Sequence, residues 1–322
     1  MNSLRIAVFV IFSSLTIFAN AQSFPDKPIK LVIPFTPGGS TDVIARILSK
    51  PLGEELKTNI IIDNKPGAGT VLGAELVAKA APDGYTLLLS SGTTYVVNAV
   101  VMKKLPYNPQ TSFDPLGIVG STGLVLLANS SLVKANNLKD LAAEIKGNPK
   151  LAVYGSFGMA TTSHFMGEMI ASAIGLKLMH VPYKGSAPEM SDLIGGQIPL
   201  SVDTVVAAIP QLKAGKIKAI MVTSEKRAPL LPTVQTAGES GYPSIQMSTW
   251  FAIVGPQGLP ENVQRKLEHA IAKVMSMKET KDALTANGFV PDYGTPAQYR
   301  AKVFRESELL KDVATKSQIT AD

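Results

Sequence analysis

The strongest constraint on the fold is a repeated alternation of short apolar runs with segments of helical periodicity. Glycine-rich turns separate the two kinds of segment, and the apolar runs include residues 29–33, 59–64, 151–156 and 217–224. Nearly continuous apolar strands that alternate with helices are typical of parallel sheets covered by helices on both faces. The sequence therefore predicts an α/β protein with parallel-rich sheets flanked by helices.

A change in this series predicts two lobes. A long uncharged strand begins near residue 123, a second series of strands and helices follows, and residues 217–234 could bring the chain back. We expect a first lobe at 22–122, a second lobe at 123–227, and a return segment at 228–322 that ends in two amphipathic helices, 261–286 and 296–316. Two crossings between two lobes create a cleft in which small ligands commonly bind.

The first residues are typical of a secretory signal peptide. Arg5 precedes an apolar run at residues 6–18, and Ala19 and Ala21 are small residues suited to cleavage before Gln22. The run falls short of the roughly 20 residues that span a bilayer, which disfavours a membrane anchor. We therefore expect residues 1–21 to be removed on export. The chain contains no cysteine, so burial rather than disulfide bonding must stabilise it.

Two hydroxyl-rich helix entrances are the main candidates for a ligand site. In "PFTPGGSTDVIARIL", residues 34–48, prolines and glycines end a strand, and Ser40, Thr41 and Asp42 open a helix. The second entrance, within residues 154–175, carries Thr161 and Thr162. A helix start offers unpaired N–H groups and positive partial charge to an anion. Simple helix capping explains the same residues, and Asp42 would compete with an anion for that positive end.

Other motifs are weaker. Residues 67–73 imitate a dinucleotide fingerprint without its strand context, so we expect no cofactor. Residues 186–189, "SAPE", match a capping box. The three histidines are scattered, which disfavours a metal site, and His180 is interpreted as structural. Asp203 is a lone carboxylate between apolar runs, and either a satisfied core position or a cleft position is consistent with the sequence.

Several long motifs resemble one receptor family in order and spacing. They are "PFTPGGSTDVIAR", "NKPGAGTVLG", "APDGYTLL", "LPYNP", "YGSFGMATTSH", "HVPYKGSAPEMSDLIGGQI" and "LPTVQTAGESGYP". The chain resembles the periplasmic substrate-binding proteins of tripartite tricarboxylate transporters, the Bug receptors, from Phe24 to beyond Tyr299. The resemblance implies a type II periplasmic-binding fold and a monomer that binds a small organic anion, not nucleic acid. It also implies partnership with a large and a small integral membrane subunit of the transporter.

The resemblance also implies which residues hold the ligand carboxylate, partly through ordered waters. A bridging water can donate to two carboxylates, which would answer the objection raised by Asp42. The residues at the matching positions are Phe35, Thr36, Gly38, Gly39, Ser40, Asp42, Thr93, Thr94, Ser156, Thr161, Thr162 and, near the far end of the ligand, Asp203.

The chain departs from the family pattern at two places. Ala160 precedes Thr161 where the family often has Gly-Ser, which narrows the freedom of the backbone there. Pro51 lies inside the first helix, where we expect a kink or an early stop.

Two other functions fit an α/β fold of this kind. A secreted hydrolase or oxidoreductase acting on a small carboxylate would need a nucleophile paired with a base, or a set of metal ligands, and the motif loops show no such constellation. The ligand-sensing half of a transcription regulator would need a DNA-binding segment, which the sequence does not indicate. A periplasmic receptor is therefore favoured. The motifs do not specify which carboxylate is bound.

Overall fold

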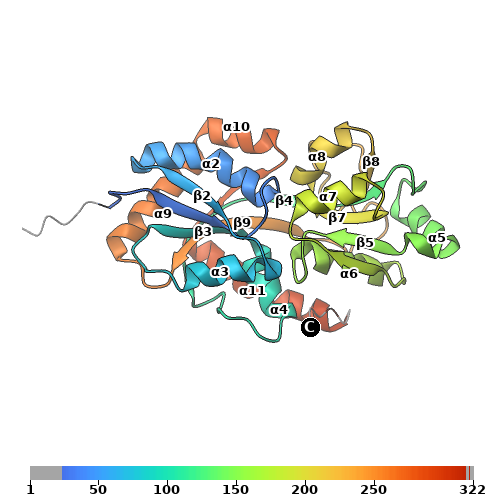
Figure 1. Ribbon diagram of the computed structural model, residues 1–322, viewed down its shortest axis with the longest axis horizontal. Helices are drawn as coiled ribbons and strands as arrows, with labels where there is room; N and C mark the ends of the chain where they lie inside the picture. The colour runs from blue at the N-terminus through green and yellow to red at the C-terminus, as the bar shows by residue number, and fades with distance from the viewer. Residues whose placement is uncertain (1–23, 317–318, 320–322) are drawn as a thin grey trace, which may run out of the picture.

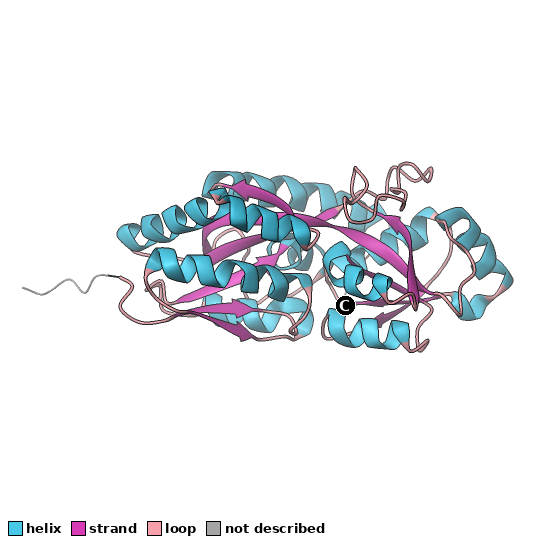
Figure 2. Ribbon diagram, turned by 90° about the horizontal axis from the view of Figure 1, so that it is seen from above, coloured by secondary structure: helices cyan, strands magenta, loops and turns pink. Residues whose placement is uncertain are grey.

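The computed structural model of the chain describes residues 24–316 and Ile319, and the expected signal peptide at residues 1–21 lies outside this part. Within it, a ten-stranded sheet runs in the order β2-β1-β3-β9-β4-β7-β5-β6, and β8 and β10 also pair with β4. Helices cover the sheet on both sides, as the view from above shows (Figure 2). The predicted α/β class with flanking helices is confirmed.

The strands at one end of the sheet come from the first apolar runs. β1 (Ile29–Ile33) pairs in parallel with β2 (Ile60–Asn64) and with β3 (Thr86–Ser91), and β9 (Ser248–Pro256) adds antiparallel to β3. Most side chains of β1 and β3 are buried on both faces, which explains why these runs are almost continuously apolar. This group of strands forms the core of the first lobe.

One long strand connects the two lobes. The first part of β4 (Phe113–Asn129) pairs with β9 and β10 (Val290–Gly294), whereas its last part pairs with strands β7 and β8. The change of partner falls between Gly123 and Leu124, next to the expected crossing at residue 122. The return to the first lobe is made through residues 223–247, which include the expected crossing at 227. The boundaries themselves stay predictions.

The second lobe contains the other end of the sheet. β5 (Val153–Ser156) lies parallel to β6 (Met179–Pro182) and β7 (Leu200–Thr204), and β8 (Ile217–Val222) completes the group through β4. In Figure 1 the two lobes lie side by side along the long axis of the molecule. The carboxyl ends of β1, β3, β5 and β7 each lead into a helix or a helical turn, so these connections are the places to look for a ligand site.

The helices form the outer layers. In Figure 1, α2 and α10 lie over one face of the first lobe and α3, α4 and α11 over the other, while α7 and α8 face α6 across the second lobe. Within the described residues, no helix is both long and apolar enough to cross a membrane. The α-helices are α2 (Ser40–Leu56), α3 (Val71–Ala78), α4 (Asn98–Val101), α5 (Leu138–Gly147), α6 (Thr162–Ala173), α7 (Ser186–Ile194), α8 (Val205–Lys213), α9 (Glu261–Ser276), α10 (Lys278–Ala286) and α11 (Pro296–Lys316).

The early stop that was one of the two expectations at Pro51 does not occur, because Leu52 and Leu56 continue the buried face of α2 beyond the proline. The kink, the other expectation, stays a prediction. The helix ends at Leu56 and is capped by Lys57, whose backbone is left-handed (φ 56°) and donates its N–H to the last turn. The expected single helix at 261–286 is instead two helices, because Met277 is extended (ψ 136°) between α9 and α10.

Candidate functional site

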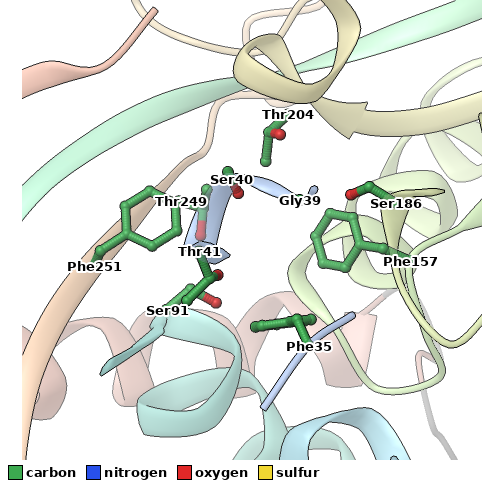
Figure 3. A pocket seen from close by; sticks show the side chains of 10 residues that line it. All are labelled: Phe35, Gly39, Ser40, Thr41, Ser91, Phe157, Ser186, Thr204, Thr249 and Phe251. Carbon is green, nitrogen blue, oxygen red and sulfur yellow. The ribbon is translucent and has the colours of Figure 1, made fainter. Parts of the chain in front are cut away.

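A small cavity lies between the two lobes, where the loops after β1 and β5 and the start of α7 after β6 meet residues of β3, β7 and β9. Its lining combines hydroxyl groups with three phenylalanine rings, and Figure 3 shows Phe251 on one side of the space and Phe157 on the other. No lysine, arginine or carboxylate is among the lining residues. They are Phe35, Gly39, Ser40, Thr41, Ser91, Phe157, Ser186, Thr204, Thr249 and Phe251.

The lobes are closed over this cavity. Its volume is about 10 Å³, which is roughly the space that one water molecule needs. The rings of Phe35 and Phe157 meet edge to face across the cleft, with centroids 5.8 Å apart. Any organic ligand larger than water therefore requires the lobes to move apart and close again around it.

Three helices begin at the cavity. Gly39 precedes α2 and lines the cavity itself, Ser186 is the first residue of α7, and Thr204 is the N-cap of α8. Each helix start carries N–H groups without partners inside the helix and a positive partial charge. Three such ends around one cavity make a site for an anion without any cationic side chain.

Asp42 supports the first loop from behind the cavity. Its carboxylate accepts hydrogen bonds from the Gly38 N–H (3.0 Å) and the Asn64 side chain (3.1 Å), and an ion pair with Arg46 (2.8 Å) neutralises its charge. Burial alone would raise the pKa of Asp42, but the bonds from Arg46, Gly38 and Asn64 outweigh it and hold the pKa below its usual value. Because Asp42 is paired with Arg46, it leaves the positive start of α2 largely available to a ligand.

The second-lobe loop is held by its own hydroxyls. Thr161 caps α6 by accepting from the His164 N–H (3.4 Å), and its hydroxyl donates to the Gly158 carbonyl (2.6 Å). The Ser156 hydroxyl donates to the same carbonyl (3.0 Å) and is hydrogen-bonded to His180 Nε2 (2.6 Å). Ala160 has φ +58°, a left-handed conformation that favours glycine, so the departure from the family pattern is accommodated with local strain. These hydroxyls organise the loop and do not line the cavity.

A third loop joins the lobes on one side of the cleft. The Thr93 hydroxyl donates to Thr162 Oγ1 (3.3 Å) and accepts from the Thr162 N–H (3.1 Å). Asn98 Nδ2 donates across the same boundary to the Ala160 carbonyl (3.0 Å). Thr94 turns away from the cleft and hydrogen-bonds to Ser90 (2.6 Å) and Thr70 (2.8 Å). The closed state is therefore held by direct hydrogen bonds between lobes.

The expected capping box at residues 186–189 was wrong. Gly185 is the N-cap of α7 and makes no side-chain cap; the Ser186 hydroxyl instead donates to Asp203 Oδ1 (3.0 Å). Glu189 points inward, is fully buried, and accepts a hydrogen bond from Ser201 (2.5 Å). A serine and a glutamate three residues apart serve here to join α7 to β7.

Asp203 combines the two positions that the sequence left open. It is fully buried, yet the two residues bonded to it, Ser186 and Thr204, both line the cavity. Burial raises the pKa of Asp203 to about 6, although the bonds from Thr204, Ser186 and Glu189 act in the opposite direction. Asp203 is thus a buried carboxylate that does not line the cavity but contacts two residues that do.

Two histidines stack behind the second-lobe loop. The rings of His164 and His180 lie 4.0 Å apart and nearly parallel. Burial lowers the pKa of His164 to about 4 and, together with the neighbouring ring, that of His180 to about 3. His180 holds Ser156 and thus acts in the structure of the loop. Within the described residues, no group of three His, Cys, Asp or Glu side chains could hold a metal ion.

Three of the expected ligand residues line the cavity: Phe35, Gly39 and Ser40. The other nine lie outside this lining; Asp42, Ser156, Thr161 and Asp203 are a layer behind it. Whether any of the twelve contacts ligand stays a prediction. Two of the lining residues, Thr249 and Phe251, carry no local signal in the sequence. Five others lie within or beside recognised motifs but were not assigned to the ligand site: Thr41, Ser91, Phe157, Ser186 and Thr204. The expected residues outside the lining are Thr36, Gly38, Asp42, Thr93, Thr94, Ser156, Thr161, Thr162 and Asp203.

Comparison with known proteins gives consistent matches along the chain. The family model described as "Tripartite tricarboxylate transporter family receptor" matches residues 44–316. The protein BugT of Bordetella pertussis is 33% identical over 302 residues, covering 94% of this chain and 92% of that protein.

Two solved structures are similar over nearly their whole length. The periplasmic binding protein BugD has a TM-score of 0.87 at 32% identity, covering 92% of this chain and 99% of its own. The Rhodopseudomonas palustris protein Rpa4515, solved with adipate, has a TM-score of 0.88 at 31% identity with the same coverage of 92% and 99%.

Proposed function

The chain belongs to the tripartite tricarboxylate transporter receptor family, the Bug receptors, and we propose that it binds a small organic carboxylate in the cavity between its lobes. The observation that carries this proposal is the convergence of the starts of α2, α7 and α8 on a hydroxyl-lined cavity without a cationic side chain. An anion would be held there by backbone N–H groups and hydroxyls.

One hydroxyl in the cavity supports this reading directly. Thr249 Oγ1 is buried and has no hydrogen-bond partner among the described residues, although it lines the cavity. A buried hydroxyl without a partner costs free energy, of the order of 1–3 kcal/mol. A ligand oxygen, or a water that bridges to one, would relieve this cost. The adipate in the related Rpa4515 structure is a ligand of the proposed class.

The chain would act as a receptor in the periplasm and not as an enzyme. It would be a monomer that loses residues 1–21 on export and delivers its ligand to a large and a small integral membrane subunit. The lining supports a receptor because it offers hydroxyls and rings but no base, no acid and no metal ligand set. The alternative is a secreted enzyme with the same fold, and the experiments must distinguish such an enzyme from a receptor.

A thermal-shift screen with mono-, di- and tricarboxylic acids, followed by calorimetry on the hits, tests the proposal. We expect saturable binding with one ligand per chain, and the bound acid should be recovered chemically unchanged after prolonged incubation. Recovery of a product would favour the enzyme instead. Failure of every acid to raise the melting temperature of the folded protein would contradict the carboxylate assignment.

Export is tested separately. Mass spectrometry of the protein from a periplasmic fraction should show a chain that begins at Gln22. A soluble protein that keeps residues 1–21 would contradict the leader.

A further inference from the structure

Two carboxyl groups lie side by side behind the second-lobe wall of the cavity. Glu189 on α7 and Asp203 on β7 are both fully buried and within hydrogen-bonding reach of each other. One oxygen of each, Glu189 Oε2 and Asp203 Oδ2, has no other partner among the described residues. The remaining oxygens are satisfied by Ser201, Ser186 and Thr204. These two oxygens are therefore the atoms that remain available for a hydrogen bond between the two carboxyl groups.

Among the described residues, no cation forms an ion pair with either carboxyl group. The nearby Tyr183 hydroxyl donates to Asp192, so it does not donate to the pair. Lys184 is exposed on the loop before α7. Two buried carboxyls in contact cannot both be ionised, so one proton stays between them. Burial and the charge of Asp203 raise the pKa of Glu189 well above its usual value, which makes Glu189 the protonated partner.

The pair determines how the cavity wall hydrogen-bonds. Asp203 Oδ1 accepts from the Ser186 hydroxyl (3.0 Å), the Thr204 hydroxyl (3.2 Å) and the Thr204 N–H (2.6 Å). Both hydroxyl protons are therefore directed away from the cavity. Ser186 and Thr204 present oxygen lone pairs to a ligand, which are acceptors that need a donor.

The two lobes differ in charge at this point. In the first lobe, Arg46 neutralises Asp42, so the start of α2 keeps its positive character for an anion. In the second lobe, Asp203 has no ion-pair partner among the described residues, so the starts of α7 and α8 attract an anion less strongly than the start of α2 does. The carboxylate end of a ligand should therefore lie toward α2, and its other end toward Ser186 and Thr204.

We propose that Glu189 is a specificity-determining positioning residue: by donating a hydrogen bond to Asp203 it keeps that carboxylate ionised, so that the second-lobe wall selects ligands whose remote end carries an N–H or O–H donor. The substrate class is a carboxylic acid with an amide, ammonium, hydroxyl or un-ionised acid group at the other end. An ionised second carboxylate is disfavoured. This inference rests on the proposed function, because it concerns the ligand of the same cavity.

Matched pairs of acids measure the selection. Succinate, glutarate and adipate are each compared with their monoamide, so that length and the first carboxylate are the same within a pair. At pH 7.5 the monoamide should bind at least about tenfold more tightly, since two like charges within several ångströms repel strongly inside a protein. The charge of the first carboxylate raises the second pKa of a diacid above that of an isolated carboxyl. The dissociation constant of the diacid is therefore calculated for its doubly ionised form at each pH between 8 and 6. Over this range the ratio of the two dissociation constants should fall toward one as Asp203 takes up a proton.

Two variants separate positioning from simple packing. Glu189→Gln keeps the donor to Asp203 and the acceptor for Ser201, so the ratio at pH 7.5 should stay as in the unmodified protein. Glu189→Leu removes the donor, so Asp203 should become protonated at higher pH and the ratio should fall toward one already at pH 7.5. If Glu189→Leu does not fold, the inference is tested by two other measurements. These are the pH dependence of the diacid-to-monoamide ratio in the unmodified protein and the same ratio in Glu189→Gln.

Each outcome is decisive. Equal binding of diacid and monoamide by the unmodified protein at every pH overturns the inference but leaves the proposed function intact. A Glu189→Gln variant that loses the preference also overturns it, since the role would then not be hydrogen-bond donation. If neither member of any pair binds the folded protein, the inference falls together with the proposed binding of small carboxylates.

Discussion

Replacing Gly69 by alanine should prevent full closure of the lobes. Gly69 lies in the turn before α3, in the first lobe, with φ +59°, and a Cβ atom there would lie 2.2 Å from the Met159 carbonyl oxygen of the second lobe. Such a contact must open by about 1 Å before it becomes an ordinary one. The obstacle is backbone on the far side and cannot rotate away.

The expected loss of affinity follows from the hydrogen bonds that need this approach. Asn98 to the Ala160 carbonyl (3.0 Å) and the Thr162 N–H to Thr93 (3.1 Å) both cross the boundary beside Gly69. Each contributes about 1 kcal/mol, so Gly69→Ala should weaken ligand binding by about 2 kcal/mol, or roughly thirtyfold. The left-handed backbone costs a further ~1–2 kcal/mol of folding stability, but this term is the same in the open and closed states.

Calorimetry with the tightest-binding acid of the screen measures the loss, and small-angle scattering measures closure. Gly175→Ala is the matched control, because Gly175 has a similar φ of +67° and nothing within 4 Å of a new Cβ. The control should lose stability but keep its affinity and its contraction on binding. Gly69→Ala should contract less than the control. If the two variants bind the acid with the same affinity, closure at this contact does not contribute to binding and the reasoning is refuted.

Other predictions concern single side chains. Thr162→Val should weaken acid binding by about 1 kcal/mol in calorimetry, whereas Lys184→Met, at an exposed position, should leave it unchanged; the reverse result would contradict a site built from hydroxyls and N–H groups. Ala160→Gly should raise the melting temperature, by up to about 1 kcal/mol of stability, because it relieves the strain at φ +58°; a lower melting temperature would argue against that strain. Because the folded-state pKa values of His164 and His180 lie below the ordinary value of 6.5, at about 4 and about 3, the unfolded chain takes up protons first as the pH falls. The free energy of unfolding should therefore decrease from about pH 6.5 toward pH 4, and urea titrations of His180→Gln should show a shallower decrease than the unmodified protein.

Much of the fold could be predicted because its signals are local. The apolar run of β1, the glycines that follow it and the polar start of α2 lie within about 20 consecutive residues, and each acts on its neighbours through backbone conformation and hydrogen bonding. The same kind of signal indicated the hydroxyl-rich loop at Thr161. The α/β class and two of the loops that reach the cleft were thus accessible from the chain alone.

The function of individual side chains was less accessible, because one local pattern fits more than one environment. Ser186 and Glu189 have the spacing of a capping box whether they turn to their own helix start or into the core. Only the position of β7 beside α7 supplies Asp203 as a partner, and for this reason the Ser186 side chain turns into the core. Pro51 likewise predicted a kink or an early stop, and the early stop does not occur because the buried face of α2 extends past the proline.

The sequence by itself determined the alternation of strands and helices and the chemistry of the loops that start α2 and α6. Only the tertiary structure decided which of those groups share a cavity. Thr249 and Phe251 join Ser40 because β9 inserts between β3 and β4, a pairing of strands more than a hundred residues apart. Strand order depends on the burial of whole sheet faces and on long-range closure of the chain, and no neighbouring residues encode either one.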